Sequence, residues 1–196
     1  MDEIVSDELI LEGVRSGDKS ACDLCIIKYR DRLYRLALGL LHNEDDAEDV
    51  VQETFLNAFN AIDSFRGHSG LGTWLYRITY NNAMMRLRKQ PPETESVDRA
   101  LDLSEEGFLV PRQFFDWCCL PEEDFQSAEV RQELVKAIGG LSPNLSSTFI
   151  LRDMEGLSTR ETAVALDTSE DVIKTRLRRA RLQLREALSA YIEPNP

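Results

Sequence analysis

The sequence has few of the residues that interrupt helices, with only ten glycines and seven prolines among 196 residues. Leucine, alanine, glutamate and arginine are plentiful, and all four favour helix over strand. No apolar run approaches the roughly 20 residues that are needed to cross a bilayer. The acidic start Met1-Asp2-Glu3 also lacks the basic segment of a signal peptide. These absences predict an all-α protein that is not inserted in a membrane and is cytoplasmic.

Cysteine is scarce as well, and the four residues comprise a C-x-x-C pair, Cys22 and Cys25, and the adjacent Cys118 and Cys119. The C-x-x-C spacing is compatible with zinc or redox chemistry. However, it lies within a helical apolar pattern, where free cysteine packs as a small hydrophobe, and the chain has only two histidines. A phosphate-binding glycine loop and a nucleophile elbow are both missing. We therefore expect no metal, no cofactor and no enzymatic activity.

Basic residues are outnumbered overall, since the net charge is −12, but the charge is unevenly distributed. Residues 1–90 carry 11 basic and 15 acidic residues, residues 91–127 carry 2 and 10, and residues 128–196 carry 10 and 10. The segment from Lys174 to Arg185 contains six basic residues and no acidic one. A local basic stripe on one helix is typical of a surface that contacts nucleic-acid phosphates, whatever the global charge.

Helical periodicity divides the chain into two small helical domains, residues 1–90 and 128–196, joined by an acidic linker, residues 91–127. The first domain is predicted to contain four helices. The first begins near Leu9, the second spans 21–41, the third follows Asn43 and ends at Ile62, and the fourth runs from about 73 to 89. Asn43 is the expected N-cap of the third, because acidic residues follow it in the first turn. The linker contains an unusual apolar segment, 114–120, which either packs on one of the domains or forms a docking patch for a partner.

The second domain resembles a helix-turn-helix. Ser142 and Pro143 predict the start of one helix, and the series from Ser158 to Glu161 fits a capping box at the start of the next. A longer helix follows Thr168, with an apolar face and the basic stripe on its other faces. Such a recognition helix enters the major groove, with flanking arginines and lysines on phosphates. This arrangement predicts DNA binding.

Two sets of motifs extend the resemblance over nearly the whole chain. The stretch from Asp45 to Phe55, followed by Phe65-Arg-Gly-His-Ser and Thr73-Trp-Leu-Tyr-Arg-Ile78, resembles region 2 of the extracytoplasmic-function sigma factors of bacterial RNA polymerase. Leu157-Ser-Thr-Arg-Glu-Thr-Ala163, followed by Lys174-Thr-Arg-Leu-Arg-Arg-Ala-Arg181, resembles their region 4. The resemblance implies an alternative sigma factor that binds core RNA polymerase, recognises the −10 and −35 promoter elements and opens the DNA.

The resemblance also assigns roles to individual residues. Asp49, Gln52 and Glu53 share one helical face and would bind the clamp of the polymerase β′ subunit, while the second domain would contact the β flap. The −10 element would be read and melted by a set from the first domain: Arg66, His68, Trp74, Arg77, Tyr80, Asn81, Arg86 and Arg88. The −35 element would be contacted by a set from the recognition helix: Lys174, Thr175, Arg176, Arg178, Arg179 and Arg181. An anti-sigma protein is the further partner that the family implies.

Three departures from the family pattern affect the DNA contacts. His68 replaces a frequently acidic residue, Gly72 replaces a larger one, and Asp171-Val172 replaces a frequent Gly-Thr. Two alternatives stay open beside the sigma factor. One is a helix-turn-helix regulator that acts without polymerase docking. The other is a decoy that occupies the polymerase clamp but reads no promoter.

Overall fold

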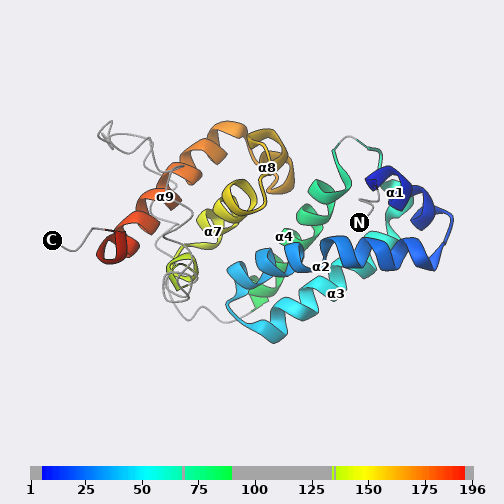
Figure 1. Cartoon of the computed structure of the whole chain (residues 1–196), viewed down its shortest axis with the longest axis horizontal. Helices are drawn as coiled ribbons and strands as arrows, with labels where there is room; N and C mark the ends of the chain where they lie inside the picture. The colour runs from blue at the N-terminus through cyan, green and yellow to red at the C-terminus, as the bar shows by residue number, and fades with distance from the viewer. Residues whose placement is uncertain (1–5, 68, 90–133, 135, 193–196) are drawn as a thin grey trace.

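The computed structural model describes residues 6–67, 69–89, 134 and 136–192, and the side chains of 190–192 are excluded. The helices are α1 (Asp7–Arg15), α2 (Lys19–Leu41), α3 (Glu44–Asn60), the short η1 (Ile62–Ser64), α4 (Leu71–Lys89), α7 (Pro143–Phe149), the π-helical turn η5 (Ile150–Met154), α8 (Thr159–Ala165) and α9 (Glu170–Ile192) (Figure 1). The described residues contain no strand, and the all-α fold is confirmed. None of these helices is long and apolar enough to cross a membrane.

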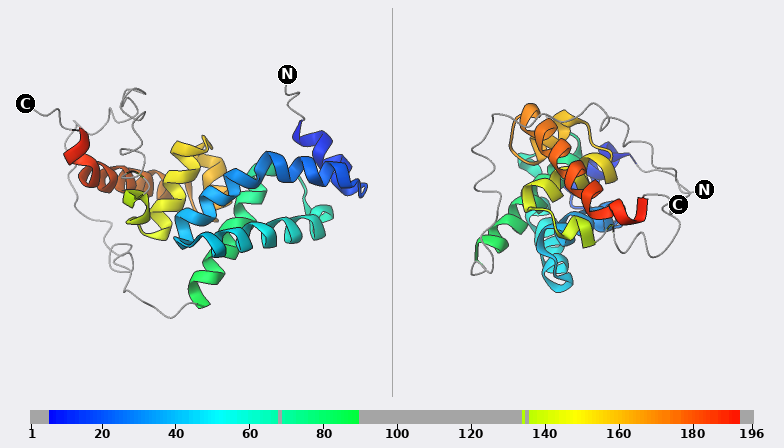
Figure 2. Two further views of the ribbon diagram at one scale, coloured as in Figure 1. Left: turned by 60° about the horizontal axis from the view of Figure 1, so that its bottom comes forward. Right: turned by 90° about the vertical axis from the view of Figure 1, so that its left-hand side faces the viewer.

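Helices α1–α4 form what we call the N-terminal unit, residues 6–89, in which α2 and α3 lie antiparallel and α4 packs on both (Figures 1 and 2). The reversal between α2 and α3 takes two residues. His42 adopts a left-handed conformation, with φ of 54°, and ends α2. Asn43 then caps α3 as predicted, because its side chain accepts a hydrogen bond from the Asp46 amide at 2.9 Å. Leu33, Leu36 and other buried residues fill the space between the helices.

The fourth helix begins at Leu71, two residues before the predicted start, and so includes Gly72 in its first turn. A side chain at Gly72 would crowd the ring of Tyr29, since a Cβ atom there would lie 3.0 Å from Tyr29 Cε1. Tyr29 in turn donates a 2.6 Å hydrogen bond to Asp7 of α1. Glycine therefore allows α4 to approach α2 closely at this point, which a larger residue would prevent.

The C-terminal unit, residues 134 and 136–192, contains the predicted helix-turn-helix in α8 and α9. Ser158 and Glu161 form the predicted capping box, with bonds of 3.1 and 2.8 Å between side chain and backbone in both directions. Helix α7 begins at Pro143 after Ser142 as expected, but it continues into the wider π-helical turn η5. Gly156 follows η5 after Glu155 and has a φ of +74°, a left-handed conformation that favours glycine.

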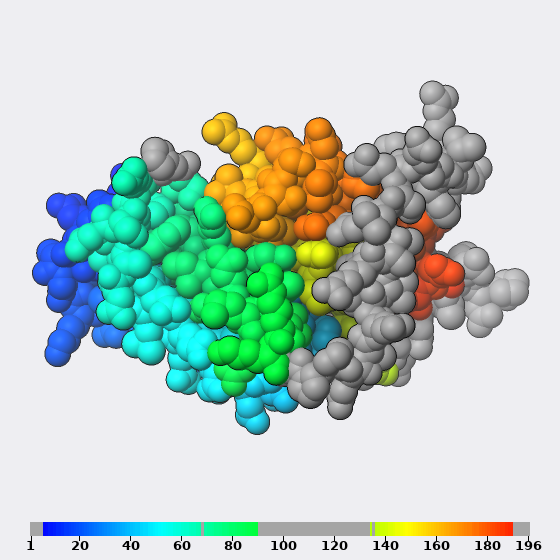
Figure 3. Space-filling model, turned by 180° about the vertical axis from the view of Figure 1, so that it is seen from behind, coloured from blue at the N-terminus to red at the C-terminus, as the bar shows by residue number. Residues whose placement is uncertain are grey.

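The two units pack directly against each other. Helix α4 contacts α8, and α2 contacts α7 and η5. In the space-filling view of Figure 3, the surface of α4 (green) meets that of α8 and α9 (orange). Buried apolar side chains from both units form one continuous cluster. The predicted linker, 91–127, and its apolar segment 114–120 lie outside the described residues.

Candidate nucleic-acid interface

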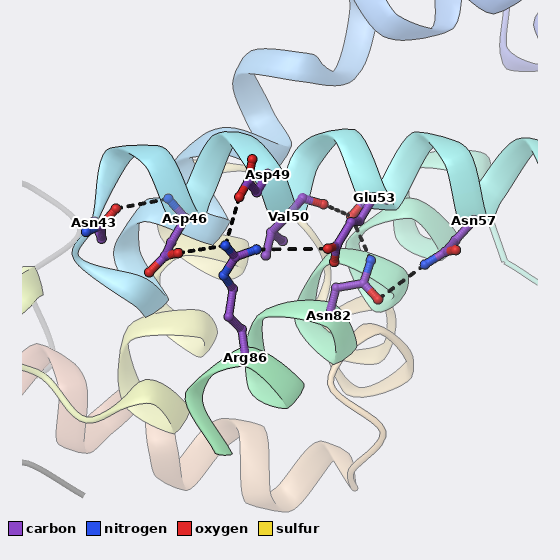
Figure 4. A network of polar contacts seen from close by, with 9 residues as sticks. Asn43, Asp46, Asp49, Val50, Glu53, Asn57, Asn82 and Arg86 are labelled. Carbon is purple, nitrogen blue, oxygen red and sulfur yellow. Dashed lines mark hydrogen bonds and ion pairs between the residues drawn. The ribbon is translucent and has the colours of Figure 1, made fainter. Parts of the chain in front are cut away.

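The predicted polymerase-binding residues lie together on the outer face of α3. Asp49, Gln52 and Glu53 are all exposed, as expected for positions three and four residues apart on one helix. Arg86 of α4 reaches this face (Figure 4), and its guanidinium lies 2.8 Å from both Asp46 and Asp49 and 3.9 Å from Glu53. The hydrogen bond to Asp49 is the largest of the effects that raise the pKa of Arg86.

Arg86 was predicted to contact DNA, which stays a prediction, and the structure places it among three carboxylates of α3. A polar bridge that the sequence did not indicate lies next to it. The Asn82 side chain accepts a hydrogen bond from Asn57 at 3.4 Å and donates one to Thr54 at 3.4 Å. Together these contacts fix the outer part of α4 against α3 (Figure 4). Asn57 and Asn82 are 25 residues apart on different helices, so no helical spacing predicts that the two would pair.

Several of the predicted −10 residues lie on or beside α4 with open surfaces. Arg66, Asn81 and Arg88 are exposed. Trp74 is half-buried and packs against Phe65, with ring centroids 5.0 Å apart. Its tilted stacking fixes the indole at the start of α4. His68 lies outside the described residues, so its contribution stays a prediction.

Two other predicted −10 residues contact the C-terminal unit. The Tyr80 hydroxyl donates a 3.3 Å hydrogen bond to Asn144 of α7. Arg77 forms a 3.2 Å ion pair with Asp167 in the turn between α8 and α9. The nearby Tyr76 is 2% exposed. The surface that was expected to face −10 DNA is thus partly covered by the other half of the chain.

The recognition helix α9 presents Lys174, Thr175 and Arg178 as exposed residues near its start, as predicted. Asp171, in the first turn of α9, interacts with two of these residues, Lys174 and Thr175. Its carboxylate is 2.9 Å from Lys174 Nζ, and its carbonyl accepts a 3.0 Å hydrogen bond from the Thr175 hydroxyl. Hydrogen bonding to Asp171 raises the pKa of Lys174.

Further along α9, the three other predicted −35 residues, Arg176, Arg179 and Arg181, are half-buried. Arg181 binds Asp153 at the end of η5 through two hydrogen bonds of 2.7 and 2.8 Å. A bidentate arginine–carboxylate pair has well-defined geometry. Arg181 therefore holds η5 against α9, in addition to the phosphate contact predicted for it.

The polar contact between the units that the sequence did not reveal is centred on Glu155. Its carboxylate, 1% exposed, lies 2.7 Å from Arg32 and 2.8 Å from Arg35, and it accepts a 2.9 Å hydrogen bond from Tyr76. Burial by itself raises the pKa of this carboxyl, but the hydrogen bonds from Arg35, Arg32 and Tyr76 outweigh it and leave the pKa lowered. Burial raises the pKa of Tyr76 as well. No spacing rule links residue 155 to residues 32, 35 and 76.

The cysteines of the N-terminal unit pack in its core. Cys25 is buried, and burial raises its pKa to about 12, so its thiol is protonated at neutral pH. Cys22 is half-buried. The described parts of the chain contain no group of three or more histidine, cysteine or acidic side chains placed to hold a metal ion.

Comparison with known proteins accounts for this combination of surfaces. Residues 25–91 match the family Sigma-70 region 2, and residues 131–184 match Sigma-70, region 4. The ECF RNA polymerase sigma-E factor of Escherichia coli K12 is 32% identical over 99% of this chain and 98% of its own length. The chain belongs to the ECF sigma factors. The RNA polymerase sigma-H factor of Pseudomonas aeruginosa is 30% identical over 96% of this chain and 94% of its own.

A solved structure of another sigma factor has the same arrangement of helices. The sigma factor RpoE of Bartonella quintana, in complex with the anti-sigma factor NepR, is 27% identical, covers 88% of this chain and 98% of its own, and has a TM-score of 0.62. In the structure of the present chain, local contacts explain two departures of this ECF sigma factor from its family. Gly72 accommodates the Tyr29 ring. Asp171 pairs with Lys174, which lessens the basic charge at the start of the recognition helix.

Proposed function

We propose that this chain is an alternative sigma factor that joins core RNA polymerase, recognises −10 and −35 promoter elements and opens the DNA. The observation that carries the proposal is the match of two sigma regions, in order, on one chain. In this role the protein supplies binding and duplex opening, and catalysis belongs to the polymerase. It acts where polymerase and promoter DNA are found, in the cytoplasm.

The acidic face of α3 is the surface that we assign to the polymerase. Glu53 and Asp49 are exposed acceptors, suited to charge-assisted hydrogen bonds with arginine or lysine on the β′ clamp. Gln52, on the same face, adds an uncharged donor and acceptor. The C-terminal unit would contact the β flap, which would set the spacing between the two DNA-binding surfaces.

The DNA surfaces divide between the two units. Asn81, exposed on α4, has the donor and acceptor needed to read the edge of a base that has left the stack. Trp74 and Tyr80 provide aromatic surface nearby, and stacking on such rings is worth about 1–3 kcal/mol per base. We assign Lys174 and Arg178 on α9 to the −35 major groove, and the arginines that follow to phosphates.

Regulation by an anti-sigma protein is part of the proposal, because the Bartonella quintana relative was solved in complex with one. An inhibitor of this kind would cover the polymerase-binding and DNA-binding faces. Segment 114–120 stays the predicted docking patch for such a partner, with packing on one of the domains as its alternative role.

The test is transcription in vitro with purified core polymerase on a library of genomic fragments. We expect a small set of start sites that share −10 and −35 elements and that require this chain. A helix-turn-helix regulator would bind duplex DNA alone as a dimer and direct no new start sites. A decoy would bind core polymerase and only suppress transcription by other sigma factors.

A further inference from the structure

The interface between the two units is organised around one buried carboxylate. We call Glu155 with Arg32, Arg35 and Tyr76 the Glu155 cluster. Glu155 belongs to the C-terminal unit, and its three side-chain partners belong to the N-terminal unit, on α2 and α4. Arg32 Nη2 also donates a 3.3 Å hydrogen bond to the Glu155 carbonyl. Both the side chain and the backbone of Glu155 are therefore held by the opposite unit.

The local backbone explains how a carboxylate reaches this position. The Glu155 amide donates to the Ile150 carbonyl at 2.9 Å, a five-residue step that closes the wide turn η5. Single π-helical turns of this kind occur frequently at functional sites. Gly156, with its φ of +74°, reverses the chain immediately afterwards. Glu155 thus projects from the end of η5 toward α2 and α4.

The energetics of the cluster suit a contact that forms and separates. A buried carboxylate is unfavourable unless donors surround it, and here three donors do so. The Arg32 and Arg35 side chains keep 41% and 45% of their surface exposed. When the units separate, these guanidinium groups return to water and Glu155 becomes a surface residue. Separation therefore leaves no unpaired charge buried in either unit.

The same interface covers residues that we assign to promoter DNA. Tyr80 and Arg77 are engaged by Asn144 and Asp167 of the C-terminal unit. The Tyr80 hydroxyl is bonded to Asn144, so a base that stacks on this half-buried ring would meet α7 beside it. In contrast, the acidic face of α3 is exposed in this arrangement.

We propose that the Glu155 cluster holds the chain in a closed arrangement that occupies Tyr80 and Arg77 of the −10 face of α4, and that the units must separate before promoter DNA contacts these two residues. The proposal rests on the proposed function for the assignment of that face. The closed arrangement itself rests only on the contacts between the units. The closed arrangement and its effect on DNA binding are therefore tested by different measurements.

Small-angle X-ray scattering of the full chain tests the closed arrangement. We expect wild-type protein to give the radius of gyration of the closed structure. Glu155→Lys places a third cation beside Arg32 and Arg35 and should lower the closed-to-open ratio by about thirtyfold or more. Glu12→Lys is the matched control, since it makes the same charge change at an exposed residue of α1, and α1 lies at the end of the N-terminal unit away from α9 (Figure 1). Its radius should stay that of wild type.

A second variant approaches the interface from the other unit and changes no charge. A Cβ atom at Gly39 of α2 would lie 2.3 Å from Ile150 Cδ1, and Ser146 donates a 2.8 Å hydrogen bond to the Gly39 carbonyl. Gly39→Leu should therefore force α7 and η5 away from α2, while it improves helix propensity in α2. Far-UV circular dichroism checks that the helices persist, and the radius should increase as in Glu155→Lys.

Fluorescence anisotropy with a short labelled single-stranded DNA of random sequence tests the covering of the −10 face. Both expanded variants should bind this probe at least several-fold more tightly than wild type, and Glu12→Lys should not. An extended wild-type scattering curve, or compact curves for both folded variants, overturns the closed arrangement. Expansion without tighter DNA binding overturns the covering of DNA residues. Failure of wild-type protein to direct transcription would contradict the proposed function and leave the scattering result intact.

Discussion

Arg86 Nη2 on α4 lies 2.8 Å from the Asp49 carboxylate on α3, so a residue expected at DNA and a residue expected at polymerase pair with each other. The contact joins the two helices that carry the proposed polymerase and −10 surfaces. Because Asp46 and Glu53 also contact Arg86, one cation offsets part of the charge of this face. A basic partner on the polymerase would share these acceptors with Arg86.

Combining Gln52→Ala with Glu53→Lys should abolish binding to core polymerase while the protein stays helical. Loss of a hydrogen-bonded charge partner in an interface typically costs about 2–5 kcal/mol, and the lysine adds repulsion against basic groups of the clamp. Pull-down with purified core polymerase is the measurement. Glu12→Lys, on the exposed surface of α1, controls for the change in charge. Undiminished binding by the folded double variant would contradict the assignment of this face.

Arg86→Ala should lower the free energy of unfolding by about 1 kcal/mol, since partly exposed ion pairs are each worth a fraction of that and Arg86 makes several. Thermal or chemical denaturation measures this change. The salt dependence of DNA binding then decides between the two roles of Arg86. If Arg86 contacts a phosphate, its removal should make the slope of log affinity against log salt concentration shallower by about one. If Arg86 stays paired with α3, the slope should not change. Arg88→Ala, exposed one half-turn away, is the comparison variant.

Local sequence signals predicted the helices well because their causes are local. The Asn43 cap, the Ser158–Glu161 capping box and the helix-turn-helix all depend on residues within one or two turns of each other. The predicted start of α4 was two residues too late, because glycine at 72 is unfavourable in a helix by propensity. The contact of Gly72 with the Tyr29 ring, which favours glycine there, is not visible in the sequence. Packing between helices determined that boundary.

The sites were predicted less completely, because the contacts that modify them join distant parts of the chain. The face formed by Asp49, Gln52 and Glu53 follows from helical spacing alone. The pairing of Arg86 with that face spans 37 residues, and that of Glu155 with Arg32 spans 123. No periodicity in the sequence connects such positions. The burial of Tyr76 has the same origin, since its hydroxyl donates a hydrogen bond to Glu155, 79 residues away.

Asn81→Ala should slow promoter opening more than it weakens duplex binding. The exposed amide is placed to read a base only after that base leaves the stack, and one good base contact is worth roughly 1–3 kcal/mol of discrimination. Permanganate footprinting of open complexes, with −10 variants of a promoter found by transcription, measures the effect. Equal opening by wild type and variant on every −10 sequence would refute this role.

Asp171→Asn should strengthen −35 binding and steepen its salt dependence by about one, because Lys174 would no longer share its charge with a neighbouring carboxylate. The same change removes an acidic residue from the first turn of α9, which should cost about 0.3–1 kcal/mol of stability. Anisotropy titrations at several salt concentrations, with denaturation in parallel, separate the two effects. Glu186→Gln, exposed near the far end of α9, removes the same charge and should change neither slope nor affinity. Identical titrations for Asp171→Asn and wild type would mean that the charge of Lys174 does not contribute to −35 binding.

The closed arrangement should depend on pH through Glu155. Its pKa in the closed chain is below the ordinary value of 4.5, so the ionised form stabilises closure at neutral pH. That stabilisation is complete above the ordinary value and is lost as the pH falls below it and through the lowered pKa. Scattering between about pH 7 and about pH 3.5 should therefore show wild-type expansion only at the acidic end.

Other carboxylates titrate in the same range, so the comparison must isolate Glu155. Glu161, whose pKa is lowered chiefly by its side-chain hydrogen bond with Ser158, lies in the capping box of α8. Glu161→Gln should keep the acid-induced expansion, while Glu155→Gln should already be more open at neutral pH and gain less on acidification. A Glu155→Gln variant that expands on acidification as much as wild type, from the same compact state, would show that another group controls the closed arrangement.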